Sequence, residues 1–141
     1  MEAFNEAAYH ELMAYTLALG DPSFIHQHVV DAYAVQTALP DSKPIGIVFG
    51  LVGLYLHLEL GFSGRQVQKA HMKLARVRRD WALPHLPQHR GNIVVSNVIA
   101  TSPGEQRDSM ISEWCLSVWK PWEPERNFIA ALVRAEGCHG T

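Results

Sequence analysis

The chain is poor in cysteine, in charge of one sign and in long hydrophobic runs, and each shortage excludes a class of protein. Its 141 residues include two cysteines, Cys115 and Cys138, which lack the paired spacing of a zinc or redox motif. The formal net charge of −2 gives no general attraction to nucleic acid or to an anionic membrane. The first residues are acidic where a signal peptide would be basic. We therefore expect a cytoplasmic protein with free thiols.

The longest hydrophobic run, residues 45–60, is shorter than the roughly 18 to 20 apolar residues that a membrane span needs. It is apolar on every side, which is typical of a helix buried in a protein core. Gly46, Gly50 and Gly53 each cost about 1 kcal/mol of helix propensity, and such residues persist where another backbone must approach closely. The run therefore predicts a central buried helix, with His57 near its end, and no association with membranes.

No internal repeat, low-complexity segment or convincing pair of strands accompanies this run, and 48% of the residues are hydrophobic. Apolar residues at spacings of three and four, together with caps and proline breaks, predict further helices. They cover residues 4–19, 22–39, 63–81, 102–119 and 125–137, with a short turn at 96–100. Pro84 and Pro87 make residues 82–91 the longest loop. The sequence thus predicts an all-α fold, a single domain over residues 1–141 with about six helices packed around residues 45–60.

Eight histidines are a large number for this length, and one comes from each of the first four predicted helices. His28 and His71 lie on apolar faces, His57 lies on the buried run, and His10 lies beside the main apolar stripe. Metal sites in helical bundles are built from inward-projecting side chains on facing helices. Imidazoles suit zinc first and iron next. We therefore predict a divalent-metal site of His28 and His57 with His71 or His10.

Four other polar side chains are close enough in sequence to complete such a site or to orient a ligand imidazole. They are Glu11, Asp31, Gln36 and Glu59. An open coordination position would allow metal-dependent hydrolysis, whereas a closed site would be structural. The competing interpretation has equal weight, because a histidine on an apolar face is usually hydrogen-bonded to a neighbour in the core. Whether the chain is an enzyme stays open at this point.

The residues that follow Gly61 offer a different class of function. Residues 56–67 have the glycine turn and the capped second helix of a helix-turn-helix, and the second helix carries Arg65, Lys69 and Lys73 on its outer face. Against this, His57 falls where the motif needs a small residue, and the net charge is wrong for a stand-alone DNA-binding domain. The alternative is therefore a non-enzymatic interaction module that contacts nucleic acid through residues 64–80. Self-association is left open.

Several of these segments resemble an uncharacterised bacterial domain-of-unknown-function family. The matching segments are residues 9–12 (Tyr-His-Glu-Leu), residues 24–33 with Gln36, residues 54–57 (Leu-Tyr-Leu-His) and residues 64–71 (Gly-Arg-Gln-Val-Gln-Lys-Ala-His). The resemblance covers residues 9 to 81 well and residues 114–119 loosely. It implies a cytoplasmic bacterial helical domain without an established activity. Members often open with a paired-cysteine segment of zinc-ribbon appearance, and this chain has no cysteine before Cys115.

Overall fold

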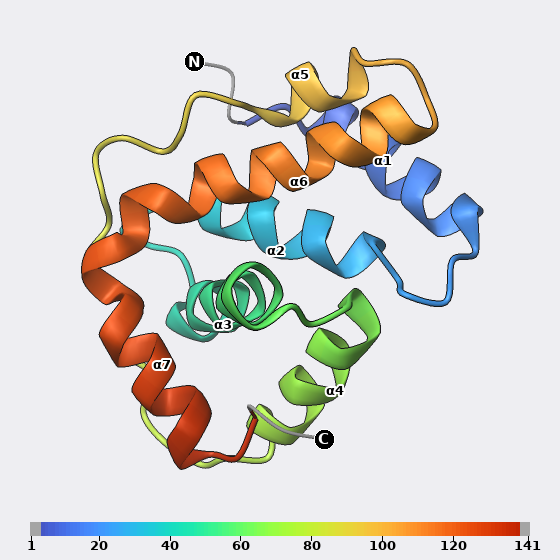
Figure 1. Cartoon of the computed structure of the whole chain (residues 1–141). Helices are drawn as coiled ribbons and strands as arrows, with labels where there is room; N and C mark the ends of the chain where they lie inside the picture. Colours follow the sequence, from blue (N-terminus) through green and yellow to red (C-terminus); the bar gives the residue numbers. More distant parts are fainter. Residues whose placement is uncertain (1–3, 139–141) are drawn as a thin grey trace.

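The structure is a computed structural model that describes residues 4–138, and these residues form helices and no β-strand (Figure 1). The helices are α1 (Glu6–Leu19), α2 (His26–Gln36), α3 (Pro44–Leu60), α4 (Gly64–Leu74), α5 (Val95–Ile99), α6 (Glu105–Trp119) and α7 (Arg126–Ala135). A 3-10 turn over Lys120–Glu125 connects the last two. The predicted all-α class is confirmed. Within residues 4–138, no helix is long and apolar enough to cross a membrane.

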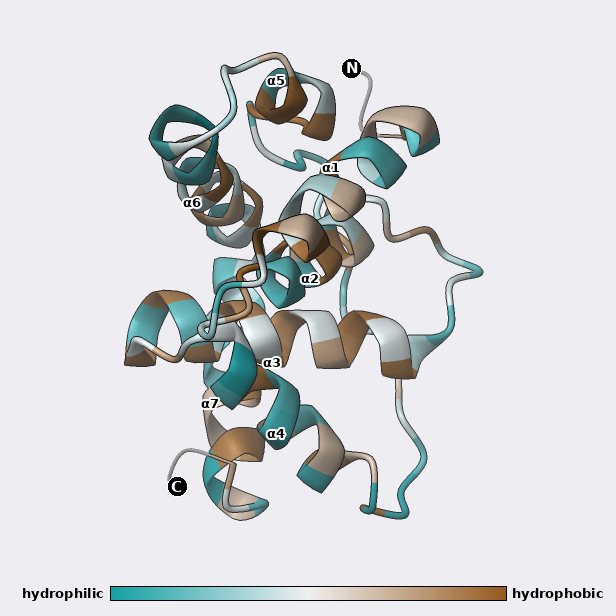
Figure 2. Cartoon of the chain, turned by 90° about the vertical axis from the view of Figure 1, so that its right-hand side faces the viewer, coloured by the Kyte–Doolittle hydropathy of each residue, from teal (hydrophilic) through white to brown (hydrophobic). Residues whose placement is uncertain are grey.

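Helix α3 is the centre of the molecule, as its sequence predicts. Figure 2 shows it running between α2 on one side and α4 and α7 on the other, and α6 also packs against it. Leu51, Leu54 and Leu56 point to different sides of the helix and are all fully buried. A helix with apolar residues all round can be stable only when neighbours cover every face. The packing of four helices around α3 meets that requirement.

Two glycines let α2 cross α3 closely. A Cβ atom on Gly50 would lie 2.7 Å from Cγ2 of Val35, and one on Gly53 would overlap the carboxyl group of Asp31. In contrast, a Cβ on Gly46 would meet nothing within 4 Å. The close approach of the two helices therefore depends on Gly50 and Gly53 and not on Gly46.

Local sequence explains where α3 ends and α4 begins. Gly61 adopts a left-handed conformation with φ of 74°, which terminates α3, and the Phe62 amide donates to the Leu56 carbonyl. Ser63 then accepts a hydrogen bond from the Gln66 amide, and the Gln66 side chain accepts one from the Ser63 amide. This capping box starts α4 only three residues after α3, so the two helices turn sharply at residues 61–63.

The prediction of a helix over residues 63–81 is wrong beyond Leu74, where α4 ends. The chain continues without regular structure, and the Trp81 ring packs edge-on against Phe49 of α3 at a centroid distance of 5.7 Å. Val77 and Trp81 are thus partly buried at the spacing that suggested a helix. Tertiary packing of these two side chains, not helical periodicity, accounts for the apolar pattern. Similarly, α2 ends at Gln36 and not at Leu39.

The long loop between α4 and α5 is fastened to the core by two polar side chains. Nε2 of the buried Gln36 donates to the carbonyls of Arg90 and Ile93, at 3.0 and 2.8 Å, and its Oε1 accepts from the Trp114 indole at 3.0 Å. In return, the Arg90 guanidinium donates to the carbonyls of Gln36 and Ala38. Gln36 therefore joins α2, α6 and the loop, and none of the hydrogen bonds that its side chain makes within residues 4–138 goes to a histidine.

Candidate functional site

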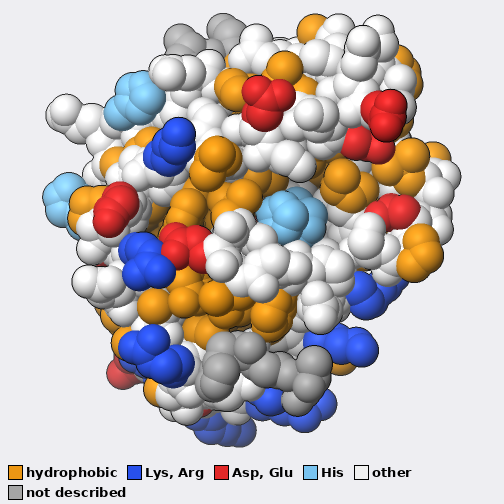
Figure 3. Space-filling model, in the orientation of Figure 1, with side chains coloured by type: hydrophobic (Ala, Val, Ile, Leu, Met, Phe, Trp, Pro, Cys, Tyr) orange, Lys and Arg blue, Asp and Glu red, His pale blue; other side chains and the backbone are white. Residues whose placement is uncertain are grey.

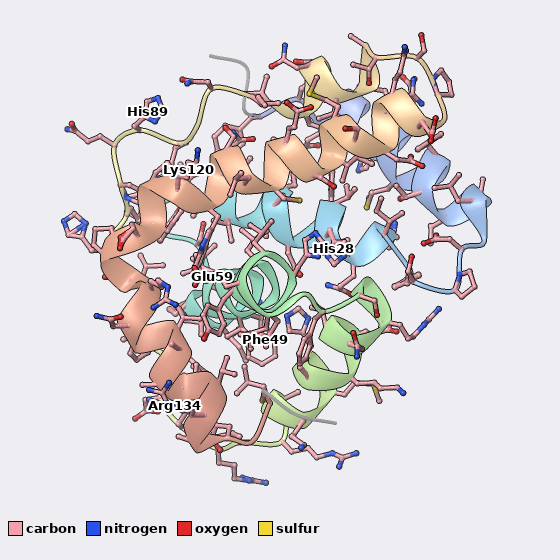
Figure 4. All side chains as sticks on the ribbon, viewed as in Figure 1. His28, Phe49, Glu59, His89, Lys120 and Arg134 are labelled. Atoms are coloured by element: carbon pink, nitrogen blue, oxygen red, sulfur yellow. The ribbon has the colours of Figure 1, made fainter. Side chains whose placement is uncertain are left out.

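A pocket of about 300 Å³ opens where the start of α2, the end of α3, the start of α4 and the middle of α6 meet. Figure 4 shows the labelled His28 near the centre of the molecule, in the region bounded by these elements. In the same orientation, Figure 3 shows a histidine surface among hydrophobic side chains near the middle of this face. The lining residues are Ser23, Ile25, His28, His57, Gly61, Phe62, Ser63, Ile111 and Ser112.

Two of the predicted histidines meet in this pocket. The rings of His28 and His57 are stacked, with their centroids 3.5 Å apart and their planes 16° from parallel. Nδ1 of His57 lies 3.0 Å from the Phe62 carbonyl oxygen. A carbonyl can only accept, so Nδ1 of His57 carries the proton, and Nε2 of the neutral ring keeps a free lone pair. The helix-ending turn at Gly61 therefore sets the tautomer of His57.

His28 is the buried member of the pair, with 5% of its surface exposed. Its Nδ1 is buried and has no hydrogen-bond partner within residues 4–138. Burial, with a smaller contribution from His57, lowers the pKa of His28 to about 3, although the Asp21 carboxylate opposes this shift. Burial also lowers the pKa of His57. Both rings are therefore neutral near pH 7, and the pocket contains two uncharged imidazoles.

The segment that forms the outer wall of the pocket has a strained backbone. Phe24 has a φ of 60°, which is uncommon for a bulky residue. A Cβ on Gly64 would overlap the Phe24 carbonyl, so the segment lies directly against the start of α4. The Arg65 amide donates to the Ser23 carbonyl at 2.9 Å, which fixes this approach. Such strain persists where surrounding contacts enforce it, and it often occurs at functional sites.

His71, the third predicted ligand, belongs to a different polar cluster. Its Nε2 donates to the Phe49 carbonyl at 2.7 Å, and its Nδ1 lies 3.5 Å from Nε2 of Gln27. Gln27 also donates to Oδ1 of Asp31, which is 4.0 Å from Nε2 of His71. Burial raises the pKa of Asp31 well above its ordinary value and lowers that of His71. The cluster is therefore a neutral hydrogen-bond network between α2, α3 and α4.

The remaining predicted site residues also lie elsewhere. His10 is exposed beside the Tyr9 ring, and Glu11 is exposed on the same helix. Glu59 accepts hydrogen bonds from the Trp119 indole at 2.9 Å and from Arg126 at 2.6 Å, so it ties α3 to the last helices. In residues 4–138 no group of three or more His, Cys, Asp or Glu side chains is placed so that it could hold a metal ion. The four-histidine arrangement is thus reduced to the pair of His28 and His57.

Two of the three basic residues singled out on α4 have partners within the chain. The Arg65 guanidinium lies 4.3 Å from the centroid of the Phe24 ring and donates to Gln68, and Nζ of Lys73 donates to the Gly137 carbonyl at 3.0 Å. Lys69 is exposed. These contacts leave the basic face on the surface, so the nucleic-acid alternative stays a prediction.

The sequence predicts the turn at residues 61–63, but sequence reasoning missed that this turn completes the pocket. Phe62 supplies the carbonyl that orients His57, and Ser63 lines the opening. Gly61 followed by a capping box is a readable signal for two helices joined by a tight turn. It places residues 61–63 beside the last turn of α3, where His57 lies. The contribution of Ile111 and Ser112 from α6 has no such local signal.

A protein-family model described as a family of unknown function, DUF5946, matches residues 6–123. The match includes every residue that lines the pocket. No curated protein and no solved structure matches the chain.

Proposed function

The chain belongs to the DUF5946 family of unknown function, and we propose that it acts on or binds a small molecule in the pocket around His28 and His57. In this proposal His57 presents its Nε2 lone pair to the bound molecule as a proton acceptor. His28 lies against the other face of the ring, keeps water away from it and holds its orientation. A neutral imidazole with a fixed tautomer is the usual general base of enzymes that work near pH 7.

The observation that supports this proposal is that His28, which lines the pocket, has a buried Nδ1 atom without a hydrogen-bond partner within residues 4–138. A buried polar atom without a partner costs about 1 to 3 kcal/mol. Within residues 4–138 four side-chain atoms are in this situation, on His28, Asp31, Tyr33 and Trp122, and of these residues only His28 lines the pocket. His71 in the same fold has hydrogen-bond partners for both ring nitrogens, which is what a purely structural histidine needs. The strained Phe24 segment at the same pocket supports the same interpretation.

The tautomer of His57 provides the first test. In protein with ¹⁵N-labelled histidine, long-range ¹H–¹⁵N NMR spectra at pH 7 should show His57 protonated at Nδ1 and unprotonated at Nε2. The assignment comes from the His57→Phe variant, in which these signals disappear, and the exposed His10→Phe variant is the matched control. A charged His57 ring at pH 7, or a proton on Nε2, would remove the proton acceptor and with it the proposal.

A divalent metal ion is a second candidate for the pocket. Histidines that bind metals generally donate their other ring N–H to a carboxylate or a backbone carbonyl, as Nδ1 of His57 donates to Phe62. His57 would supply one ligand through Nε2, while the stacked His28 ring directs its lone pairs parallel to those of His57 and not toward the same ion, so most coordination positions would be left to water or substrate. Such an ion would support metal-dependent hydrolysis. Zinc is the first choice and iron the second.

Metal titration of protein without a histidine tag tests this candidate. We expect one equivalent of zinc or ferrous iron to bind with loss of the free His57 Nε2 signal, and the His57→Phe variant to bind at least about tenfold more weakly. The His10→Phe variant should bind like the wild type. Binding that is equally strong in the His57→Phe variant would show that any metal site lies elsewhere.

A further inference from the structure

Among the described residues 4–138, no charged side chain lines the histidine pocket. Its nine lining residues are serine, isoleucine, histidine, glycine and phenylalanine. The nearby Arg65 guanidinium is directed onto the Phe24 ring and Gln68. The Asp21 carboxylate accepts from the Ser23 hydroxyl at 2.7 Å and from the Ile25 amide at 3.1 Å. The described lining residues therefore include no cation that could neutralise an anionic ligand, and the Asp21 carboxylate, whose charge acts on His28, is already hydrogen-bonded.

Three amides at the start of α4 do not compensate for the missing cation. Free amides at a helix N-terminus commonly bind phosphate or carboxylate groups. In α4 the amides of residues 65, 66 and 67 already donate to the Ser23 carbonyl, the Ser63 hydroxyl and the Ser63 carbonyl. An anion in the pocket would thus lose its hydration without gaining these donors.

The polar groups that remain free are few and uncharged. Nε2 of His57 can accept a hydrogen bond, because Nδ1 carries the proton. The Ser63 hydroxyl oxygen accepts from Gln66, so its hydrogen is available to donate, while Ser23 gives its hydrogen to Asp21 and keeps its lone pairs. The Ser112 hydroxyl also lines the pocket, and three apolar side chains stand beside these groups: Ile25, Phe62 and Ile111. The pocket thus offers both acceptors and a donor beside an apolar surface.

We infer that the ligand of this pocket is a small uncharged molecule with an apolar face, which donates one hydrogen bond through an N–H or O–H group and accepts another. Amides and neutral N-heterocycles have this combination. The inference rests on the proposed function of the His28–His57 pocket and adds the chemical class of its ligand. The donated hydrogen meets Nε2 of His57, and the accepted bond comes from the Ser63 hydroxyl.

Three compounds of nearly the same shape test the role of charge: benzamide, benzoate and benzylamine. Each is titrated into the full chain at pH 7.5, with affinity from calorimetry and location from the NMR signals of the histidine rings. We expect benzamide to shift the His28 and His57 signals and to bind at least about tenfold more tightly than the two ions. The His57→Phe variant should bind benzamide about tenfold more weakly, and His10→Phe should bind it like the wild type.

The outcomes separate the ligand class from the existence of the site. Benzoate or benzylamine binding as tightly as benzamide, with the same histidine shifts, overturns the uncharged class and leaves the pocket as a binding site. No shift of His28 or His57 with any of the three compounds overturns the ligand class and counts against the proposed site as well. Benzamide affinity that is unchanged in the His57→Phe variant also overturns the inference, because the proposed acceptor would then be irrelevant.

Discussion

The Gly53→Ala variant should be less stable than the wild type by about 3 kcal/mol or more, although alanine is the better helix former. The added methyl group would overlap the carboxyl group of Asp31, which is buried at the crossing of α2 and α3. Neither the added methyl group nor the Asp31 carboxyl group can move away, because the neighbouring Leu54 and Val35 are fully buried. Urea denaturation monitored by circular dichroism measures the loss.

Gly46→Ala is the matched control, since it makes the same substitution in the same helix. A Cβ at this position meets nothing within 4 Å, so the variant should gain up to about 1 kcal/mol from helix propensity. Equal stability changes in the two variants would show that α2 does not approach α3 at Gly53. Gly50→Leu, whose Cβ would lie 2.7 Å from Val35 Cγ2, should also lose several kcal/mol through overpacking.

The sequence predicts the position of α3 because a helix that is buried on all sides needs apolar residues on all sides, and such a run is easily recognised. Its residues 45–60 are apolar all round, and the structure buries nearly all of residues 47–56 in the middle of the bundle, while both ends of the run are exposed. The end of α4 could not be predicted in the same way. Val77 and Trp81 continue the apolar spacing of that helix, but they are partly buried from an irregular segment. Apolar spacing reports which side chains are buried and not the backbone conformation that buries them.

Only those contacts of the candidate site that join two side chains could be predicted from the sequence. His28 is buried and His57 is half-buried on a neighbouring helix, so an argument from polar groups in one core brings them together, and their rings are stacked. His71 fits the same argument but bonds to the Phe49 carbonyl, and Gln36 bonds to the carbonyls of Arg90 and Ile93. Every residue has a backbone carbonyl, so the sequence contains no signal for such partners.

Acid should destabilise the protein, and the His28→Phe variant should resist much of this effect. The pKa of His28 is about 3 in the folded chain against an ordinary value of 6.5. As the pH falls below 6.5, His28 becomes protonated in the unfolded chain but stays neutral in the folded chain. The contribution of His28 to stability is therefore lost progressively until the pH reaches about 3. At pH 5 this loss amounts to about 2 kcal/mol for His28 alone.

Other buried groups add to this dependence or oppose it. Burial also lowers the pKa values of His26, His57 and His71, so each contributes stability that declines in acid. Asp31 acts in the opposite direction, because its pKa is raised and its neutral form is favoured in the folded chain. The wild type should therefore keep a slope in acid even after the contribution of His28 is removed, and the comparison between variants isolates that contribution.

The measurement is the free energy of unfolding in urea at pH 7.5, 6 and 5 for the wild type, His28→Phe and His10→Phe. Phenylalanine keeps a flat ring against His57 and cannot bind a proton, so the variant should lose about 2 kcal/mol less than the wild type between pH 7.5 and pH 5. His10 is exposed, and the His10→Phe variant should follow the wild type. If the free energy of unfolding fell equally with pH in the wild type and in His28→Phe, His28 would bind a proton as readily in the folded chain as in the unfolded one. The interpretation of His28 as a neutral, buried residue, on which the proposed pocket depends, would then be wrong.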